Sequence, residues 1–424
     1  MWDKYLLYPE GQEGILFDPV SLQSASLTAD EVTRLDAGEA SIIAALEDCG
    51  FSTASRGVPQ HQAIRSHVEA MGMTGMPQRV SGYRIVITDT CNMKCTYCFV
   101  DTNTGAADMT VDDLRAGLEY LFQQNAGRDE VTIQWFGGEP TVRFDLMKYG
   151  DEYARQLAEE YQVGRVQSTL VTNGVLLKDE MIEHFKEYKY GVGVSFDGMP
   201  EDNVVERFLL SGKPADPRIH RNIQRLVEAG VYVGCNLTPT PTNVAKLPET
   251  VEFVLSLGID FIYVNTPIPI SGKWHVDGKA LSEAVFRCRL LALSRGAMLF
   301  SALDRVYQSL DTRIPRVYEH IQRDGGLNAA LLPGKRISVL DLNWRDEQFV
   351  FSIDALRNDP TLLRTAAKRL LPSDDCHECP AAAICGGPSR NDVSLRNDAE
   401  PDPQMCDFFQ NGLRMALSDQ TGLQ

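Results

Sequence analysis

The 424-residue sequence has no apolar run approaching the roughly 20 residues that cross a bilayer. Its first residues lack the basic segment and long apolar core of a signal peptide. It also lacks a polybasic stretch, and its formal net charge of -17 argues against a general binder of nucleic acid or anionic membranes. We therefore expect a cytoplasmic protein of two or three domains with no nucleic-acid or membrane partner.

Seven of the ten cysteines fall in two clusters, which favours metal or redox chemistry over a disulfide framework. The first cluster is Cys91, Cys95 and Cys98. A four-iron cluster normally takes four thiolates, so three would leave one iron open for chemistry. Half of a zinc knuckle or ordinary buried thiols are the alternatives, but no histidine nearby completes a local zinc site. The isolated cysteines, Cys49, Cys235 and Cys288, are predicted to be buried.

From about residue 82, strand-like and helix-like segments alternate, which predicts a parallel sheet with crossover helices. Strands are expected at 83–89, 131–136, 167–172, 191–196, 231–237 and 259–264. Helices are expected near 110–124, 145–161, 178–187, 218–229 and 246–257. This order predicts an α/β fold, a partial (β/α)6 barrel whose reacting groups lie at the C-terminal ends of the strands.

Polar or special residues occur at those strand ends. The second strand is followed by Gly137, Gly138, Glu139 and Pro140, where glycines let backbone approach a ligand and a carboxylate can receive an ammonium group. A simple turn is the alternative. The later candidates are Thr172, Asn173, Ser195, Asp197, Asn236 and Thr238. Strand-end polar groups also commonly satisfy nearby backbone, and Asp197 could cap a helix or line a substrate pocket.

The spacing C-x-x-x-C-x-x-C, with Tyr97 and Phe99 on either side of the last cysteine, resembles the signature of the radical S-adenosylmethionine superfamily. The resemblance implies that the open iron is chelated by the amino and carboxylate groups of S-adenosylmethionine. Gly137 to Pro140 resemble the G-G-E-P motif that binds the amino group of this cofactor. Tyr97 and the strand-end candidates at Thr172, Asn173, Ser195, Asn236 and Thr238 would then contact the cofactor.

The second cysteine cluster is Cys376, Cys379, Cys385 and Cys406. Four thiols can close a zinc site or a four-iron cluster, and spacing alone does not separate the two. The pattern is similar to the C-terminal part of the SPASM domain, which implies one auxiliary four-iron cluster. Ser389 stands where a full SPASM domain has another cysteine, and Gly334 to Ser352 supplies none upstream. We therefore expect two 4Fe-4S clusters, one catalytic and one auxiliary.

The first 80 residues show no metal-ligand pattern but have the signs of a small folded unit. A β-hairpin is predicted from 5–8 and 14–17, a helix begins after a capping-box pair, Thr28 and Glu31, and another helix covers 39–47. This order looks like a winged-helix module. In similar radical enzymes of peptide maturation, such a module binds the leader of a precursor peptide by adding a strand to a sheet edge. A structural cap without a ligand is the alternative.

The predicted organisation is a winged-helix-like domain at 1–80, a radical S-adenosylmethionine barrel at 81–270, a helical bridge at 271–332 and a SPASM-like domain at 333–424. The resemblance implies hydrogen abstraction from a ribosomally made precursor peptide and an intramolecular cross-link, either carbon-carbon or carbon-heteroatom such as a thioether. A reducing donor such as flavodoxin or ferredoxin would be needed. Asp354 and Asp197 are candidates for proton removal. The alternatives are a formylglycine-generating sulfatase-type maturase, a peptide epimerase and a non-enzymatic peptide-binding scaffold.

Overall fold

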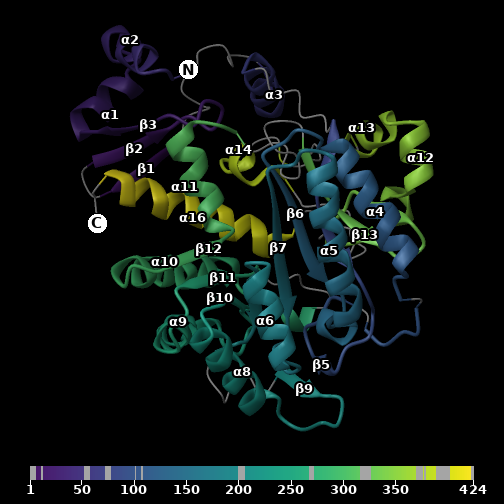
Figure 1. The fold of residues 1–424 in the computed structure, drawn as a ribbon. Helices are drawn as coiled ribbons and strands as arrows, with labels where there is room; N and C mark the ends of the chain where they lie inside the picture. The colour runs from purple at the N-terminus through teal and green to yellow at the C-terminus, as the bar shows by residue number, and fades with distance from the viewer. Residues whose placement is uncertain are drawn as a thin grey trace.

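A ten-stranded sheet forms the centre of the computed structural model, as Figure 1 shows. The structure describes residues 6–10, 13–51, 58–71, 78–100, 102–106, 108–198, 206–266, 272–315, 326–368, 376, 379–387 and 402–421. In spatial order the strands are β12 (Met298–Ser301), β11 (Phe261–Val264), β10 (Tyr232–Leu237), β8 (Gly191–Ser195), β7 (Arg165–Thr172), β6 (Glu130–Phe136), β4 (Arg79–Val86), β13 (Gly326–Leu332), β14 (Arg336–Ser338) and β15 (Val350–Ser352). Neighbours from β12 to β13 pair in parallel, and the last two pairs are antiparallel.

The six predicted barrel strands correspond to β4, β6, β7, β8, β10 and β11, and the predicted helices lie between them. These helices are α4 (Val111–Gln124), α5 (Phe144–Glu160), α6 (Asp179–Glu187), α8 (Asp216–Glu228) and α9 (Leu247–Ser256). The predicted α/β partial barrel is therefore confirmed. The largest difference is at the first strand, which ends at Val86 instead of residue 89. The residues before Cys91 are thus free to form a loop.

The prediction of a helical bridge at 271–332 was incomplete. Helices α10 (Gly278–Ser294) and α11 (Leu303–Thr312) are present, but β12 lies between them and β13 follows, and both strands belong to the central sheet. Strand β12 has only four residues, too few for its alternation to distinguish a strand from a helix end. One sheet therefore runs through three of the predicted domains.

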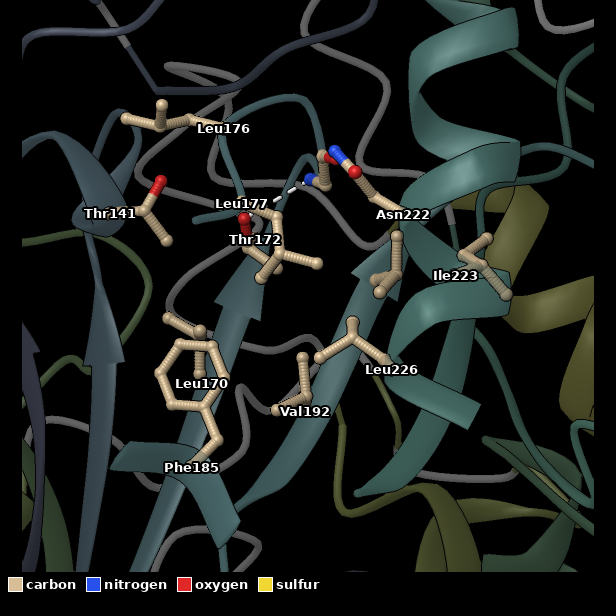
Figure 2. A pocket seen from close by; sticks show the side chains of 12 residues that line it. Thr141, Leu170, Thr172, Leu176, Leu177, Phe185, Val192, Asn222, Ile223 and Leu226 are labelled. Carbon is tan, nitrogen blue, oxygen red and sulfur yellow. Dashed lines mark hydrogen bonds between the residues drawn. The ribbon is translucent and has the colours of Figure 1, made fainter. Parts of the chain in front are cut away.

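The two faces of the sheet differ in burial. On the outer face, Leu170, Val192 and Val194 are buried and face Phe185 of α6 and Leu226 of α8 around a small pocket. Figure 2 shows Leu170 and Val192 from the strands together with Phe185 and Leu226 from the helices. The alternate residues of the same strands are half-buried or exposed on the inner face. This face is the open interior of the partial barrel.

A buried polar network also lies on the outer side. The Asp151 carboxylate of α5 is fully buried and accepts hydrogen bonds from Ser168 (3.1 Å) and the Tyr190 hydroxyl, and it pairs with Nε2 of His184 (2.8 Å). These partners come from β7, from the segment before β8 and from α6. Because a buried carboxylate needs partners, the network ties these elements together.

The N-terminal residues form a three-stranded sheet of β1 (Leu6–Glu10), β2 (Glu13–Phe17) and β3 (Ser24–Leu27), with helices α1 (Ala29–Asp36), α2 (Ala40–Asp48) and α3 (Gln60–Ala70). The predicted hairpin, the Thr28–Glu31 capping box and the second helix are confirmed, whereas β3 and α3 were not predicted. Leu16 packs into a small local core, while Ile15 and Phe17 join the main core. The module is therefore packed onto the rest of the chain.

Of the isolated cysteines, Cys235 and Cys288 are buried as predicted, but Cys49 is exposed.

Candidate active site

The first cysteine cluster lies on the loop that follows β4. Cys91 is 7% exposed, and its backbone is held by reciprocal hydrogen bonds with the Asn103 side chain, both 3.1 Å. The next residues form β5 (Met93–Cys95), which pairs antiparallel with β9 (Arg207–Leu209). Cys95 is half-buried and Cys98 is exposed. The loop thus presents three thiols at the C-terminal edge of the parallel strands.

The three thiols are near enough to influence one another electrostatically. Burial raises the pKa of Cys91 to about 12, with smaller contributions from Glu139, Cys95 and Cys98. Burial likewise raises the pKa of Cys98 to about 11, and Cys95 adds to this shift. Because a bound metal stabilises thiolates, the iron itself would have to drive their deprotonation. Among the described residues, no three or more His, Cys, Asp or Glu side chains lie close enough together to hold a metal ion as they stand.

The G-G-E-P segment packs directly against this loop. The Gly138 and Glu139 N–H groups donate to the carbonyls of Thr88 and Thr90, both at 2.8 Å. A Cβ atom would lie 2.4 Å from the Thr88 oxygen at Gly137 and 2.4 Å from the Thr90 oxygen at Gly138. The two glycines therefore admit the backbone that leads into the cysteine loop, and their contact with a ligand stays a prediction.

Glu139 is fully buried and joins several elements. One carboxylate oxygen, Oε1, accepts from the Thr141 N–H (3.1 Å), the Thr141 hydroxyl (2.6 Å) and the Thr172 hydroxyl (2.8 Å). The other, Oε2, accepts from the Asn173 N–H (2.8 Å). Burial raises the pKa of Glu139, and these hydrogen bonds oppose the shift. Since a carboxylate offers about four lone-pair positions, Oε2 retains capacity for an ammonium group.

Asn173 connects the end of β7 to the cysteine loop. Its side-chain amide donates to Oδ1 of Asn92 (2.7 Å) and lies 3.7 Å from the Cys91 sulfur. The predicted candidates Thr172 and Asn173 are therefore brought together with Glu139 and Cys91. Pro140 is buried and begins the turn that leads to α5.

A second buried group surrounds Tyr97, between the last two cysteines. The Tyr97 hydroxyl donates to Oδ2 of Asp197 (2.6 Å) and accepts from Nη1 of Arg207 (2.7 Å). Burial raises the pKa of Asp197, and Arg207 opposes the shift. Burial lowers the pKa of Arg207, but Cys95, Tyr97 and Asp197 outweigh it and raise that pKa well above its usual range.

Arg207 was missed by sequence reasoning. Its Nε is buried and has no hydrogen-bond partner among the residues that the structure describes. A buried, charged donor of this kind is costly unless a partner arrives. A cation beside Cys95 with an unused donor suits the carboxylate of a ligand held at the open iron. No local pattern marks Arg207, because its position depends on the pairing of β9 with β5.

The remaining barrel candidates lie on neighbouring strands. Ser195 at the end of β8 is in register with Asn236 of β10, and both are half-buried on the inner face. The Thr238 N–H binds Asp197 and opposes the burial that raises its pKa. These residues therefore border the same edge as the cysteine loop.

Asp354 lies elsewhere. It is in the first turn of α12 (Ile353–Asn358), its side chain is 86% exposed, and it is 3.8 Å from Arg357. Helix α12 packs against α4, which is in the outer layer. This is the position of a surface carboxylate.

The second cysteine cluster involves α14 (Ala382–Cys385), which ends at Cys385, and α16 (Pro403–Thr421), which contains Cys406. The Cys379 N–H donates to the Cys376 carbonyl (3.4 Å), and Cys385 ends α14 immediately before Gly386, whose φ is 78°. Burial raises the pKa of Cys406 to about 11, with contributions from Cys379 and Cys376. Ser389 lies outside the described residues. Gln60 of α3 donates to the Cys379 carbonyl (2.8 Å), so the N-terminal module contacts this cluster.

The described residues contain no helix long and apolar enough to cross a bilayer. The fold and the site together describe an α/β partial barrel that carries a three-thiol loop at the C-terminal edge of its strands. Residues 85–254 match the model of the Radical SAM superfamily. These residues are therefore a radical S-adenosylmethionine domain.

Two curated relatives illustrate the sequence similarity. The chain is 32% identical over 201 residues to the serine-type anaerobic sulfatase-maturating enzyme of Bacteroides thetaiotaomicron, covering 46% of this chain and 47% of that protein. It is 23% identical over 174 residues to the radical SAM cyclopropyl synthase TigE of Paramaledivibacter caminithermalis, covering 38% and 35%. The chain spans about half the length of the curated relatives it matches.

Solved structures share the fold. The native anSMEcpe structure with bound AdoMet and Cp18Cys peptide has a TM-score of 0.67 at 14% identity, covering 81% of this chain and 99% of that chain. The Streptococcus suis SuiB structure bound to precursor peptide SuiA has a TM-score of 0.55 at 17% identity, covering 93% and 96%. The likeness to SuiB therefore extends over most of the chain, beyond the barrel.

Proposed function

We propose that this chain is a radical S-adenosylmethionine enzyme that forms an intramolecular cross-link, carbon-carbon or carbon-heteroatom such as a thioether, in a ribosomally made peptide. The observation that carries the proposal is the three-thiol loop held against the G-G-E-P segment within a radical S-adenosylmethionine domain. Structural neighbours that were solved with bound peptides support a peptide substrate.

The side chains present fit the cofactors. Cys91, Cys95 and Cys98 would hold the catalytic 4Fe-4S cluster, Glu139 would receive the amino group of S-adenosylmethionine through Oε2, and Arg207 would receive its carboxylate through Nε. When bound and reduced, the cluster and S-adenosylmethionine supply a 5′-deoxyadenosyl radical that abstracts hydrogen from carbon. The candidates Tyr97, Gly137, Gly138, Pro140, Thr172, Asn173, Ser195, Asn236 and Thr238 would border this cofactor.

Cys376, Cys379, Cys385 and Cys406 would hold one auxiliary 4Fe-4S cluster, which could accept the electron released when the cross-link closes. Two clusters predict about eight irons and eight sulfides per chain. Zinc at the C-terminal site would instead give about four irons and one zinc. Metal analysis of anaerobically reconstituted chain, with the Cys376→Ala and Cys379→Ala double variant as control, separates these outcomes.

The N-terminal module would bind the leader of the precursor peptide at an edge of its sheet, where β1 and β3 are the outer strands. A flavodoxin or ferredoxin would supply electrons in the cytoplasm. Asp197 is the better placed of the two candidates for proton removal, because it lies beside Tyr97, whereas Asp354 is exposed on α12.

One alternative has its own support, since a sulfatase-maturating enzyme is among the relatives. Co-expression with short peptides encoded beside the gene, followed by mass spectrometry, tests both functions. A cross-link removes two hydrogens and leaves no aldehyde, whereas formylglycine reacts with a hydrazide probe. An epimerase would leave the mass unchanged. Normal product from the chain with Cys91, Cys95 and Cys98 all replaced by Ala would overturn the enzymatic proposal and favour a scaffold.

A further inference from the structure

On the inner face of the central sheet, β4, β6 and β7 carry mostly polar side chains together with Phe136, whereas β10, β11 and β12 carry mostly aromatic ones. Strands β4, β6 and β7 place Arg84, Thr132, Gln134, Gln167 and Thr169 on this face. Strands β10, β11 and β12 place Tyr232, Phe261, Tyr263, Met298 and Phe300 there, a set that we call the aromatic wall. Tyr232, Tyr263, Met298 and Phe300 are 48%, 43%, 48% and 37% exposed, although the residues between them are buried on the opposite face.

The aromatic wall is assembled by contacts among its own rings. The Phe261 ring lies 5.6 Å from Tyr232 and 5.0 Å from Phe300, measured between centroids. Gly234 lets the Phe261 ring lie against the sheet, because a Cβ there would be 2.8 Å from a ring carbon. At Gly191, a Cβ would lie in ordinary van der Waals contact with side-chain carbons of Thr169 (3.6 Å) and Tyr232 (3.8 Å). Gly191 therefore accepts a methyl group, whereas a larger side chain would crowd Thr169 and Tyr232 at the border of the wall.

The aromatic wall continues directly from the candidate active site. Ser195 is in register with Asn236, Asn236 with Tyr263, and Tyr263 with Phe300. With neighbouring strands about 4.8 Å apart, Tyr263 is about 10 Å and Phe300 about 14 Å from Ser195 along the sheet. An extended peptide covers this distance in three to four residues at about 3.3 Å per residue.

The chemistry of the wall limits what it can bind. Strands β10, β11 and β12 contain no charged residue, and the nearest charge in sequence is Asp260. Contiguous exposed apolar groups mark interaction sites, and aromatic rings pair favourably with one another and with cations. In a chain of net charge -17, a neutral or basic peptide carrying an aromatic side chain matches this surface best.

We propose that the aromatic wall binds an aromatic side chain of the peptide substrate, three to four residues from the residue that reacts beside Ser195. This inference rests on the proposed function, because it assigns the wall to the same substrate. It makes Tyr263 and Phe300 specificity-determining residues that act by contact with the peptide and not with the cofactor.

The test uses the full chain with its iron-sulfur clusters reconstituted. The probes are an octapeptide of glycine and serine with one central tryptophan, and its counterpart with alanine, titrated by saturation-transfer NMR. The variants are Tyr263→Ser with Phe300→Ser, which removes two rings, and Gly191→Val, which adds a branched side chain against Thr169 and Tyr232. The control is Leu290→Ser with Leu293→Ser, because these leucines are 41% and 59% exposed but lie on α10.

We expect the tryptophan peptide to bind measurably better than the alanine peptide. Loss of the two rings should weaken binding about tenfold, Gly191→Val should also weaken it, and the leucine control should not. Equal binding of the two peptides to the unaltered chain would overturn the inference. A dimer of the unaltered chain that dissociates in the two-ring variant would also overturn it, because a second copy would then cover the wall. A lower Tm of the two-ring variant with unchanged peptide binding would overturn it too, because the rings would then pack within the chain itself.

Cleavage of S-adenosylmethionine, measured in the same samples without peptide, separates this inference from the function on which it rests. Normal cleavage with no preference for tryptophan removes the inference alone. Absent cleavage with a clear preference for tryptophan removes the proposed radical chemistry and leaves the aromatic site.

Discussion

Glu139→Gln is the substitution whose effect can be worked out most fully, because every bond of the carboxylate is known. Glutamine keeps the shape but replaces one oxygen with an NH2 group. If the amide oxygen takes the Oε1 position, it keeps the bonds from Thr141 and Thr172, and the NH2 group then faces the Asn173 N–H. The opposite orientation loses more bonds. The expected defect is therefore one buried N–H without an acceptor.

A buried donor left unpaired costs about 1–3 kcal/mol. At about 1.4 kcal/mol per tenfold, the Asn173 amide should exchange its hydrogen about 5 to 150 times faster if exchange follows local opening. Glu139→Ala leaves the Thr141 N–H without an acceptor as well. The substitution should therefore lower the free energy of unfolding by about 2–6 kcal/mol, a large part of a typical stability of about 5–15 kcal/mol.

Hydrogen exchange with mass spectrometry on the iron-free chain measures the protection of the Asn173 amide without interference from the cofactor. The segment at 168–175 should lose protection in both variants, and more in Glu139→Ala. The capping box of Thr110 and Asp113 at the start of α4 serves as an internal control. Unchanged exchange at 168–175 in both variants would refute the idea that Glu139 holds β7 to the cysteine loop.

Three further predictions concern the loop, the outer network and the N-terminal module. Gly138→Ala should destabilise the chain by about 1–3 kcal/mol or more and lower the iron retained after reconstitution, since its Cβ would lie 2.4 Å from a backbone oxygen, whereas Gly191→Ala should do neither. Asp151→Leu should lower the free energy of unfolding by about 3–5 kcal/mol, because several buried donors lose their acceptor. Thermal unfolding measures the loss, and an unchanged Tm would contradict the prediction. The Arg34 side chain lowers the pKa of Glu39 from 4.5 to about 2, so the stability that this pair contributes is present above pH 4.5 and lost as the pH falls toward 2. Acid titration followed by circular dichroism should therefore show a shallower acid limb for Glu39→Gln, and identical acid limbs would count against the pairing.

Local patterns in the sequence determined much of this protein. The alternation of strand-like and helix-like segments predicted six barrel strands and their helices, because each element is encoded by its own apolar spacing. The Thr28–Glu31 capping box was predictable for the same reason, since both partners lie within one helical turn. The spacing of Cys91, Cys95 and Cys98 pointed to the family before any coordinates, and residues 85–254 match it.

Contacts between distant segments decided the rest. Arg207 reaches Tyr97 across 110 residues, and only the pairing of β5 with β9 places it beside Cys95. The close contact of Gly138 with the Thr90 backbone likewise exists only after two strands align. Strand β12 is too short to be identified from its own residues, yet it completes the aromatic wall. The sequence by itself thus predicted which cysteines would hold iron, whereas the tertiary structure decided which charges, donors and rings surround them, because burial and pairing depend on the whole chain.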